Sequence, residues 1–244
     1  MEHAFSAAEL LNVWERARSL SPTDCALLLM ASADGGISRD QLAQCSIGER
    51  DAELLNLREN LFGSRMTGRA DCPECGQAME MNFSVAEIRA TPTESAETFI
   101  AEFGDYKISF RLPNSSDLAM LVAEEGVAGQ KRRLAERCVL SATRDGQPFA
   151  AELLPDNVVD DLSERMSELD PQGDVQLALT CAHCSHHWEA PFDIVSFVWS
   201  EIHAWAMRLL RDVHVLASRY GWGEAEILAL SPWRRQVYLE LIEQ

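Results

Sequence analysis

The sequence predicts a mainly α-helical protein of the α+β class. A small β-ribbon is interrupted by an inserted α/β segment and followed by a C-terminal helical hairpin. Three observations predict this class: capped apolar helices at both ends of the chain, short runs that alternate like strands, and two widely separated Cys-x-x-Cys pairs. The chain has 244 residues, which is enough for one large domain or two small ones with an apolar core.

Helix boundary signals recur through the first 63 residues. A serine three residues before a glutamate forms a capping box, a serine-proline pair begins a helix, and glycines end helices. The signals are Ser6 with Glu9, Ser21-Pro22, Gly35-Gly36, Ser46 with Glu49, and Gly63. Residues 1–63 are therefore expected to form an N-terminal helical unit.

Four of the seven cysteines form two pairs that are far apart in the chain. The pairs are Cys72 with Cys75 and Cys181 with Cys184. Two cysteines at this spacing can present both thiolates to one ion, and two such turns complete the tetrahedron that structural zinc prefers. Strand-like runs flank each pair. Residues 64–84 together with 174–192 therefore predict a split zinc ribbon that holds one structural zinc ion per chain.

Two alternatives compete with a shared zinc site. The pairs could be separate redox or structural pairs, but a thioredoxin-type pair opens a helix within a βαβ unit, and neither pair has that context. His183, His186 and His187 are rival ligands beside the second pair. Because four thiolates leave no position for water, the site is expected to be structural, with the histidines outside it. The cysteines that stand singly in apolar runs are expected to be small buried side chains: Cys25, Cys45 and Cys138.

The inserted α/β segment is expected at residues 85–173. Tyr106, Ile108 and Phe110 alternate with polar residues, which is the period of a half-buried strand, whereas RATPTESAETF has the composition of a loop. Helices are expected in DLAMLVAEEG (capped by Ser115 or Ser116), QKRRLAERCVLSA and PDNVVDDLSERMSEL, and a strand in DVQLALTC.

Residues 193–244 predict a C-terminal helical segment. A long helix is expected to start at Asp193 or Ser196 and to end at Gly221, followed by a short helix and a last helix that starts at Ser231-Pro232. Apolar residues recur along the long helix every three or four positions: Val198, Ile202, Trp205, Leu209, Val213, Leu216 and Tyr220.

The same segment holds the candidate partner-binding residues, which are aromatic residues and arginines of the kind that dominate interface hot spots. They are Tyr220, Trp222, Trp233, Arg234 and Arg235. Trp222 stands between two glycines in a turn, and both arginines fall in the first turn of the last helix, where cations are unfavourable. A compensating acidic surface is expected either on a partner or on this chain itself, and the residues would serve the fold in the second case.

Composition excludes several classes of function. The formal net charge of −18 argues against nucleic-acid binding, which depends on phosphate neutralisation. No nucleophile-base motif, zinc-protease motif or phosphate-binding glycine loop occurs, so neither an enzyme nor a small-molecule substrate is expected. No apolar run is long enough to span a membrane, and the N-terminus lacks the features of a secretory signal. The protein is therefore expected in the cytoplasm when synthesised, where reducing conditions favour metal binding over disulfides.

The C-terminal runs carry a family resemblance. APFDIVSFVWSEI and LLRDVHVLASRYGWGEAEILALSPWRRQVYLELI resemble baseplate-associated proteins encoded in contractile phage-tail and tail-like injection clusters, and are similar to the family named for the T-even phage baseplate assembly proteins. ISFRLPNSSDLAML resembles the strand-and-helix segment of those relatives. The resemblance covers residues 65–244, and its most specific part is the C-terminal run.

The resemblance implies a non-enzymatic baseplate assembly factor or minor structural subunit, which binds other baseplate or tail proteins and can enter the particle. A different class is also open: a zinc-ribbon regulatory module that binds nucleic acid or the transcription machinery. The acidic charge disfavours direct nucleic-acid contact but leaves a basic protein partner open.

Overall fold

The computed structural model describes residues 5–91, 96–121 and 126–242. The chain divides into two compact units, one made of Met1–Ile37 and Ile194–Gln244, the other of Ser38–Asp193. The four-part division expected from the sequence stays a prediction, and each of the two units is described by itself below. None of the helices in the described ranges has the length and apolarity needed to cross a membrane.

The first unit is entirely helical within its described residues. Its helices are α1 (Ala7–Ala17), α2 (Pro22–Ala33), α9 (Ile194–Tyr220), α10 (Glu224–Leu228) and α11 (Pro232–Ile242). The Ser6–Glu9 capping box forms as predicted, because Ser6 Oγ accepts from the Glu9 N–H and the Glu9 carboxylate accepts from the Ser6 N–H. Trp14 Nε1 of α1 donates to His203 Nδ1 of α9 at 3.2 Å, which fastens the first helix to the longest one.

Helix α9 follows the predicted apolar stripe. Val198, Ile202, Leu209, Val213 and Leu216 are buried, while Trp205 is half-buried and Tyr220 is exposed. The helix begins directly after Asp193 and ends at Gly221, whose φ of 70° lies in the left-handed region that favours glycine. Its C-terminal part packs on α10 and α11 through a small core of Val213, Leu216 and Ile227.

The second unit is an α+β assembly, as the sequence predicts. Its helices are α3 (Arg39–Leu42), α4 (Ile47–Phe62), α5 (Val85–Ile88), α6 (Ser115–Leu118), α7 (Gly126–Cys138), α8 (Asp156–Leu169) and the 3-10 turns η2 (Ala151–Leu153) and η3 (Pro171–Asp174). Its strands are β1 (Arg65–Asp71), β2 (Ala78–Ser84), β3 (Phe99–Phe103), β4 (Tyr106–Phe110), β5 (Val139–Arg144), β6 (Gln147–Phe149), β7 (Gln176–Thr180) and β8 (His187–Pro191).

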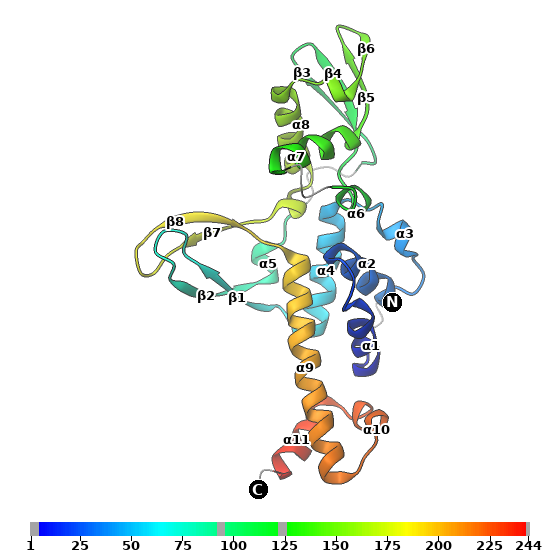
Figure 1. Cartoon of the computed structure of the whole chain (residues 1–244), viewed down its shortest axis with the longest axis vertical. Helices are drawn as coiled ribbons and strands as arrows, with labels where there is room; N and C mark the ends of the chain where they lie inside the picture. The colour runs from blue at the N-terminus through cyan, green and yellow to red at the C-terminus, as the bar shows by residue number, and fades with distance from the viewer. Residues whose placement is uncertain (1–4, 92–95, 122–125, 243–244) are drawn as a thin grey trace. The chain divides into compact units, whose positions relative to one another are not determined.

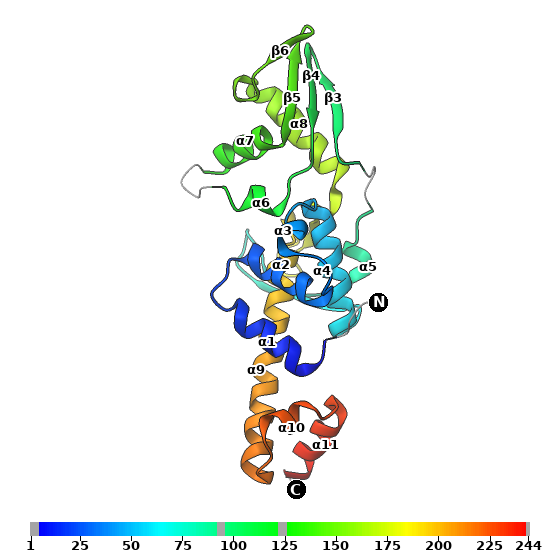
Figure 2. The same cartoon turned by 90° about the vertical axis from the view of Figure 1, so that its right-hand side faces the viewer.

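Strands β3 to β6 form an antiparallel sheet in chain order, with α7 and α8 on one face (Figure 2). The predicted strand at Tyr106–Phe110 is β4, and its Ile108 and Phe110 are fully buried in the core with Leu162 of α8. The predicted helix QKRRLAERCVLSA is wrong in its last part, because α7 ends at Cys138 and Val139 begins β5. Cys138 is buried at this junction, so the chain turns from helix to strand inside the core.

A second correction concerns the helix predicted in DLAMLVAEEG. Helix α6 covers only Ser115–Leu118, and residues 122–125 of the predicted run lie outside the described residues. Its cap is Asn114, not Ser115 or Ser116, because Asn114 Oδ1 accepts from the Asp117 N–H at 3.0 Å. The predicted helix PDNVVDDLSERMSEL and the predicted strand DVQLALTC form as α8 and β7.

Asp117 is the centre of a buried ionic cluster in this unit. Its carboxylate accepts two hydrogen bonds from Arg111, at 2.6 and 2.9 Å, and one from Arg137 Nε at 3.0 Å. Burial raises the pKa of Asp117, but the bonds from Arg111 and the Asn114 backbone outweigh it, so the pKa is lowered overall. The cluster ties the end of β4 to α6 and α7.

Candidate metal centre

Two hairpins carry the four paired cysteines. β1 and β2 form one two-stranded antiparallel sheet, β7 and β8 form another, and the hairpins lie side by side in the second unit (Figure 1). The register pairs Asp71 with Ala78 in the first hairpin and Thr180 with His187 in the second. Each Cys-x-x-Cys therefore occupies the turn at the tip of its hairpin.

The two turns share one backbone geometry. In the first, the Gly76 N–H donates to the Cys72 carbonyl at 2.9 Å, four residues back. In the second, the Ser185 N–H donates to the Cys181 carbonyl at the same distance and the same separation. The residues five positions after Cys72 and Cys181 each return a carbonyl to the cysteine N–H, at 3.0 and 2.9 Å. The turns are thus two copies of one structure, although their sequences differ outside the cysteines.

Each turn requires a left-handed residue at the same place. Gly76 has φ 70°, as glycine readily allows, and Ser185 has φ 60° at the equivalent position. A non-glycine residue in this region costs roughly 1–2 kcal/mol. The second turn keeps this conformation despite the cost, which indicates that the positions of its two sulfurs depend on it.

The four sulfurs form one tight cluster. Cys72 Sγ lies 3.7 Å from Cys184 Sγ, and Cys75 Sγ lies 3.7 Å from Cys181 Sγ. All four sulfurs lie within 4.8 Å of one another. A zinc ion with four zinc–sulfur bonds of about 2.3 Å has sulfur–sulfur edges of about 3.8 Å. The spacing fits a shared ion, whereas it is far longer than the roughly 2.05 Å of a disulfide, and all four thiols are free.

Backbone donors and crowding separate the pKa values of the thiols. The Cys184 N–H donates to the Cys181 sulfur and is the main reason that the pKa of Cys181 is lowered to about 6. The His186 N–H acts in the same direction on Cys184, but desolvation and the neighbouring thiols outweigh it and raise the pKa of Cys184 to about 12. Four sulfurs this close cannot all carry charge without a compensating cation, which a divalent metal ion supplies.

An aromatic contact joins the two hairpins at the end opposite the cysteines. The rings of Phe83 and Phe192 meet edge to face, with centroids 5.6 Å apart. Phe83 closes β2 near its end, and Phe192 follows β8 directly. The hairpins are therefore held together at both ends, by the sulfur cluster at the tips and by this ring pair at the base.

The three histidines beside the second pair lie apart from the cluster. Within the described ranges, the group that could hold a metal ion there consists of the four cysteines alone. His183 is exposed in the turn, His186 stacks on Trp188 with centroids 5.9 Å apart, and His187 Nδ1 lies 2.8 Å from Thr180 Oγ1. Two of these rings therefore have contacts of their own on the surface of the hairpin.

Buried polar residues fix the chain segments that lead into and out of the two hairpins. Asp170 Oδ2 accepts from the Gly48 N–H at 2.8 Å, in the first turn of α4, and a Cβ at Gly48 would overlap this carboxyl. Gln172 accepts from the Ala90 N–H at 2.8 Å and donates to the Ile88 carbonyl at 3.3 Å. The connection from α8 to β7 is thereby fixed to the start of α4 and the end of α5.

A buried arginine fixes the chain segment that leads into the first hairpin. Arg58 of α4 is 2 % exposed and donates to the Gly63 carbonyl and, at 2.6 Å, to the Arg65 carbonyl. These bonds fix the chain where α4 passes into β1. Sequence reasoning missed all three residues, Arg58, Asp170 and Gln172. Asp170 and Gln172 bond to residues 82 to 122 positions away, which leaves no local pattern. Arg58 bonds to carbonyls five and seven residues on, and its type and position do not reveal such backbone acceptors. Gly48, the partner of Asp170, does carry a local signal. It is a glycine inside a capping box, and a glycine there indicates that another group approaches the backbone closely.

The candidate partner-binding residues divide into two groups. Trp222 is half-buried and stacks on Tyr220 with centroids 4.7 Å apart, and both rings contact Tyr238 of α11. Arg235 is buried and donates to the Leu230 carbonyl at 2.7 Å. Three of the five residues therefore contribute contacts within the first unit.

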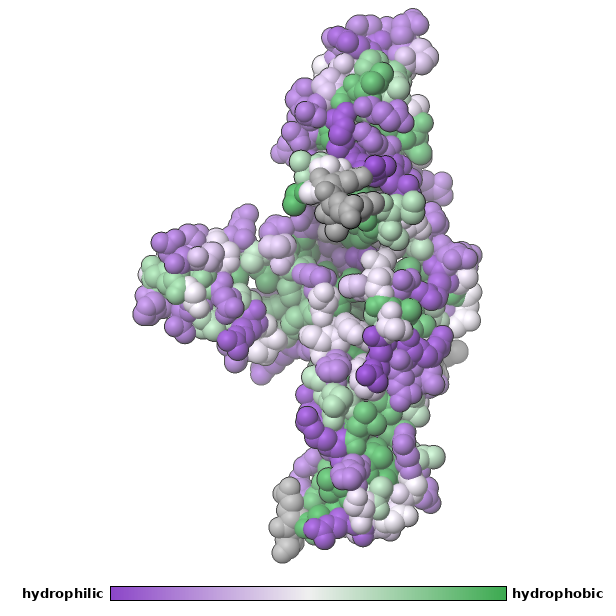
Figure 3. Space-filling view, viewed as in Figure 1, coloured by the Kyte–Doolittle hydropathy of each residue, from purple (hydrophilic) through white to green (hydrophobic). Residues whose placement is uncertain are grey.

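The other two candidates are open to solvent. Trp233 is 74 % exposed, and Arg234 beside it is also exposed. Further exposed apolar residues lie on α9 and α11, namely Met207, Val215, Tyr220 and Leu241. Figure 3 shows apolar residues gathered along the C-terminal part of α9, next to α10 and α11.

Comparison with known proteins gives one match. The family model described as T4 bacteriophage base plate protein matches residues 32–199, which is more than half of the chain. No curated protein and no solved structure matches the chain significantly. The match contains both hairpins and all four clustered cysteines. It begins earlier than the resemblance at residues 65–244, and it leaves out α10 and α11, where the resemblance is most specific.

Proposed function

The chain belongs to the T4 bacteriophage base plate protein family, and on that premise we propose that it is a non-enzymatic baseplate assembly factor or minor structural subunit of a contractile phage tail or tail-like injection particle, rigidified by one structural zinc ion. The observation that carries the proposal is the placement of four sulfurs within 4.8 Å of one another, by two hairpins that lie inside the family match.

Zinc fits the cluster through its donor set. Four thiolates at tetrahedral spacing are the ligands of structural zinc, and a closed shell leaves no position for a reacting water. Cys72 and Cys181 are buried while Cys75 and Cys184 are exposed, so the ion would lie at the tip of the paired hairpins, close to solvent. When bound, it supplies a cross-link between two chain segments and no chemistry beyond that.

The zinc proposal is tested by metal analysis of purified protein. Wild-type protein should contain close to one zinc ion per chain, and a Cys181→Ser, Cys184→Ser double variant should contain none. The matched control is Cys45→Ser, which changes a half-buried thiol outside the cluster and should leave the metal content unchanged. Wild-type protein without metal, or a double variant that keeps it, would contradict the proposal.

We place the docking element of the proposed subunit in the C-terminal segment. Trp233 and Arg234 present an indole and a guanidinium to solvent, which suits an acidic, partly apolar surface of another baseplate protein. Trp222, Tyr220 and Arg235 support that surface from within, through the ring cluster and the bond to Leu230.

The choice between assembly factor and permanent subunit depends on where the protein is found after assembly. Deletion of the gene should stop baseplate assembly in either case. Quantitative mass spectrometry of purified particles should then detect the chain at a fixed ratio to sheath protein if it is a subunit, and should not detect it if it leaves after assembly. Normal infectious or injecting particles from the deletion strain would refute both roles.

A further inference from the structure

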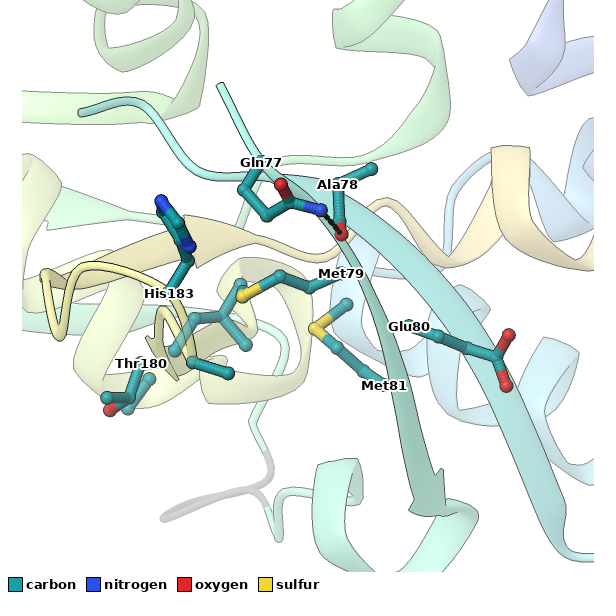
Figure 4. Close-up of a pocket in the computed structure, with 10 residues that line it drawn as sticks. Gln77, Ala78, Met79, Glu80, Met81, Thr180 and His183 are labelled. Carbon is teal, nitrogen blue, oxygen red and sulfur yellow. Dashed lines mark hydrogen bonds between the residues drawn. The ribbon is translucent and has the colours of Figure 1, made fainter. Parts of the chain in front are cut away.

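A groove runs between the two hairpins, on the side where β2 faces β7. Its volume is about 620 Å³, within the range of ligand-binding pockets, and ten residues of the two hairpins line it. Five consecutive residues come from the first hairpin, Gln77 to Met81. Figure 4 shows the Met79 side chain extending from β2 toward Thr180 and His183 of the second hairpin.

Backbone groups of β2 that are not bonded to another of the described strands face this groove. In an antiparallel pair, residues alternate between those bonded to the partner strand and those whose N–H and C=O point away from it. The Cys72 N–H bonds to the Gln77 carbonyl, which sets this alternation for the first hairpin. Ala78 and Glu80 therefore direct their backbone groups away from β1. Gln77 Nε2 donates to the Ala78 carbonyl at 3.2 Å, and this exposed side chain is easily displaced.

The same alternation applies to β7. The Cys181 N–H bonds to the His186 carbonyl, so Ala178 and Thr180 direct their backbone groups away from β8. Both residues line the groove. In the described part of the chain, β2 pairs only with β1 and β7 pairs only with β8. Two open strand edges thus border one groove.

These two edges have few of the features that normally prevent pairing with another chain. Charged residues and proline protect open edges in native proteins. The outer strands have them: β1 carries Arg65, Arg69 and Asp71, and β8 carries Glu189 and ends at Pro191. By contrast, β7 reads QLALT without a charge, and Glu80 is the single charged residue of β2. Protection is therefore weaker on the two strands that border the groove than on the outer strands.

The charge around the groove is negative on balance, with one exposed arginine, Arg69, opposite Glu80 in the register of the first hairpin. Glu80 is exposed and is the one carboxylate among the lining residues, and neither Lys nor Arg is among them. Asp71 and Glu74 are exposed on the same hairpin, near its tip. With half-buried Met79 and Met81 as the apolar part of the lining, the groove suits a segment that alternates apolar and basic residues.

We propose that this groove binds an extended segment of a partner protein, which adds a strand to the open edge of β2 with apolar residues toward the two methionines and basic residues toward Glu80. The five lining residues of the first hairpin span about 17 Å, so about five residues of the partner pair there. That the partner is another baseplate protein rests on the proposed function, but the chemistry of the segment does not.

The test uses the full-length, metal-loaded protein and two labelled seven-residue peptides with blocked ends. One peptide alternates lysine with valine, and the other alternates glutamate with valine. Fluorescence polarisation at low salt should show the lysine peptide binding at least about tenfold more tightly than the glutamate peptide. Equal binding of both peptides, or no binding of the lysine peptide up to about 1 mM, would overturn the proposal.

Two proline variants separate edge pairing from general damage. Ala78→Pro removes an N–H that faces the groove, and Thr67→Pro removes an N–H on the outer edge of β1, and neither variant changes the charge. The first should weaken binding of the lysine peptide at least about tenfold, and the second should leave it within about twofold. Similar effects of both variants would refute pairing at β2.

Hydrogen exchange on the wild-type protein gives a readout that does not depend on the variants folding. The amides of Ala78 and Glu80 should gain protection when the lysine peptide is added, whereas those of Asp71 and Arg69 should not. Unchanged exchange at β2 would count against the proposal. If sedimentation instead shows a dimer that Ala78→Pro abolishes, the groove belongs to a second copy of this chain and the partner proposal fails. Zinc content and the deletion phenotype are measured separately, so failure here leaves the proposed function standing.

Discussion

Removing the metal should destabilise the unit Ser38–Asp193 strongly. The cross-link at the hairpin tips closes the chain between Cys75 and Cys181, which encloses residues 76–180, or 105 residues. Opening a closed loop of this length returns about 4.7 kcal/mol of chain entropy to the unfolded state, by the relation used for disulfides. Zinc–thiolate bonding is not included in this value, which therefore gives the scale of the effect of the ion.

The expected shift in melting temperature follows from that free energy. For a unit of this size, each kcal/mol corresponds to roughly 2–4 °C, so chelation should lower the transition by about 10–20 °C. The assay is differential scanning calorimetry with and without a strong chelator, followed by addition of zinc. Restoration of the original transition by zinc distinguishes loss of the cross-link from irreversible damage.

Two cysteine variants test whether the change in melting temperature comes from the cluster. Cys75→Ser should reproduce the chelated transition, and chelator should then have little further effect. Cys45→Ser, outside the cluster, should melt like the wild type and respond fully to chelator. A protein that loses its zinc and melts within about 2 °C of the loaded form would show that the hairpins do not depend on the ion, because Phe83 and Phe192 and the contacts behind them suffice.

Three further predictions concern the supports of the fold. Gly48→Ala should cost about 2–4 kcal/mol, because the new methyl group displaces the Asp170 carboxylate from the start of α4, and chemical denaturation measures it. Asp117→Asn should lower the free energy of unfolding by about 3–5 kcal/mol at neutral pH. The pKa of Asp117 is lowered in the folded state, so the stability that this carboxylate contributes is present above about pH 4 and is lost as the pH falls further. The variant should not show this loss of stability at low pH. Arg235→Ala should cost about 1–3 kcal/mol, whereas Trp233→Ala should stay within about 0.5 kcal/mol yet abolish pull-down of baseplate proteins.

Each of these predictions has a matched comparison. Gly35→Ala places a methyl group where no atom lies within 4 Å and should be nearly neutral, so equal losses at both glycines would refute the steric argument. Asp145→Asn, in an exposed turn outside the buried cluster, should leave the free energy of unfolding at neutral pH nearly unchanged. Retained pull-down by Trp233→Ala, at an unchanged melting temperature, would move the docking surface away from α11.

The cysteine cluster and the C-terminal helices could be predicted from sequence because their signals are local. The spacing within each Cys-x-x-Cys pair fixes the turn, and two such turns have one efficient way to share an ion. The stripe of α9 and the glycine that ends it are likewise contained in one continuous run. The prediction that each cysteine pair is flanked by strands is consistent with β1, β2, β7 and β8, while zinc itself stays a prediction.

The four-stranded sheet was predicted only in part, for a physical reason. Strand β5 follows α7 without a break, so its first residues read as a continuation of the helix. The hairpin from β5 to β6 does carry a local signal, Asp145-Gly146, with φ of 49° and 77°, and an Asp-Gly pair between strand-like runs predicts such a turn. Strand β3 lies at the end of an acidic stretch that reads as a loop. It is recognised as a strand only through its pairing with β4 in the folded chain.

For the proposed docking residues, the sequence does not determine which side chains are exposed and which are buried. Trp233, Arg234 and Arg235 are consecutive, yet the first two are exposed and the third is buried. Which of them faces inward depends on how α11 sits against α9, since the Arg235 guanidinium turns to the Leu230 carbonyl. A rotation of one residue along the helix would have exchanged these positions, and the sequence carries no local mark that fixes it.

The distance between the two cysteine pairs along the chain also sets an order of events during synthesis. The first pair leaves the ribosome 105 residues before the second, which is roughly 5–20 s at bacterial or eukaryotic elongation rates. Through that interval a nascent chain offers two thiolates and no complete site, while strands β3 to β6 and helices α7 and α8 emerge. Capture of the proposed ion would thus wait until the whole intervening sheet has been made, and a chain that stops before Cys184 would lack a complete site. Such a fragment would carry one pair of thiols without the other, so binding of the proposed ion would distinguish chains translated past Cys184 from shorter ones.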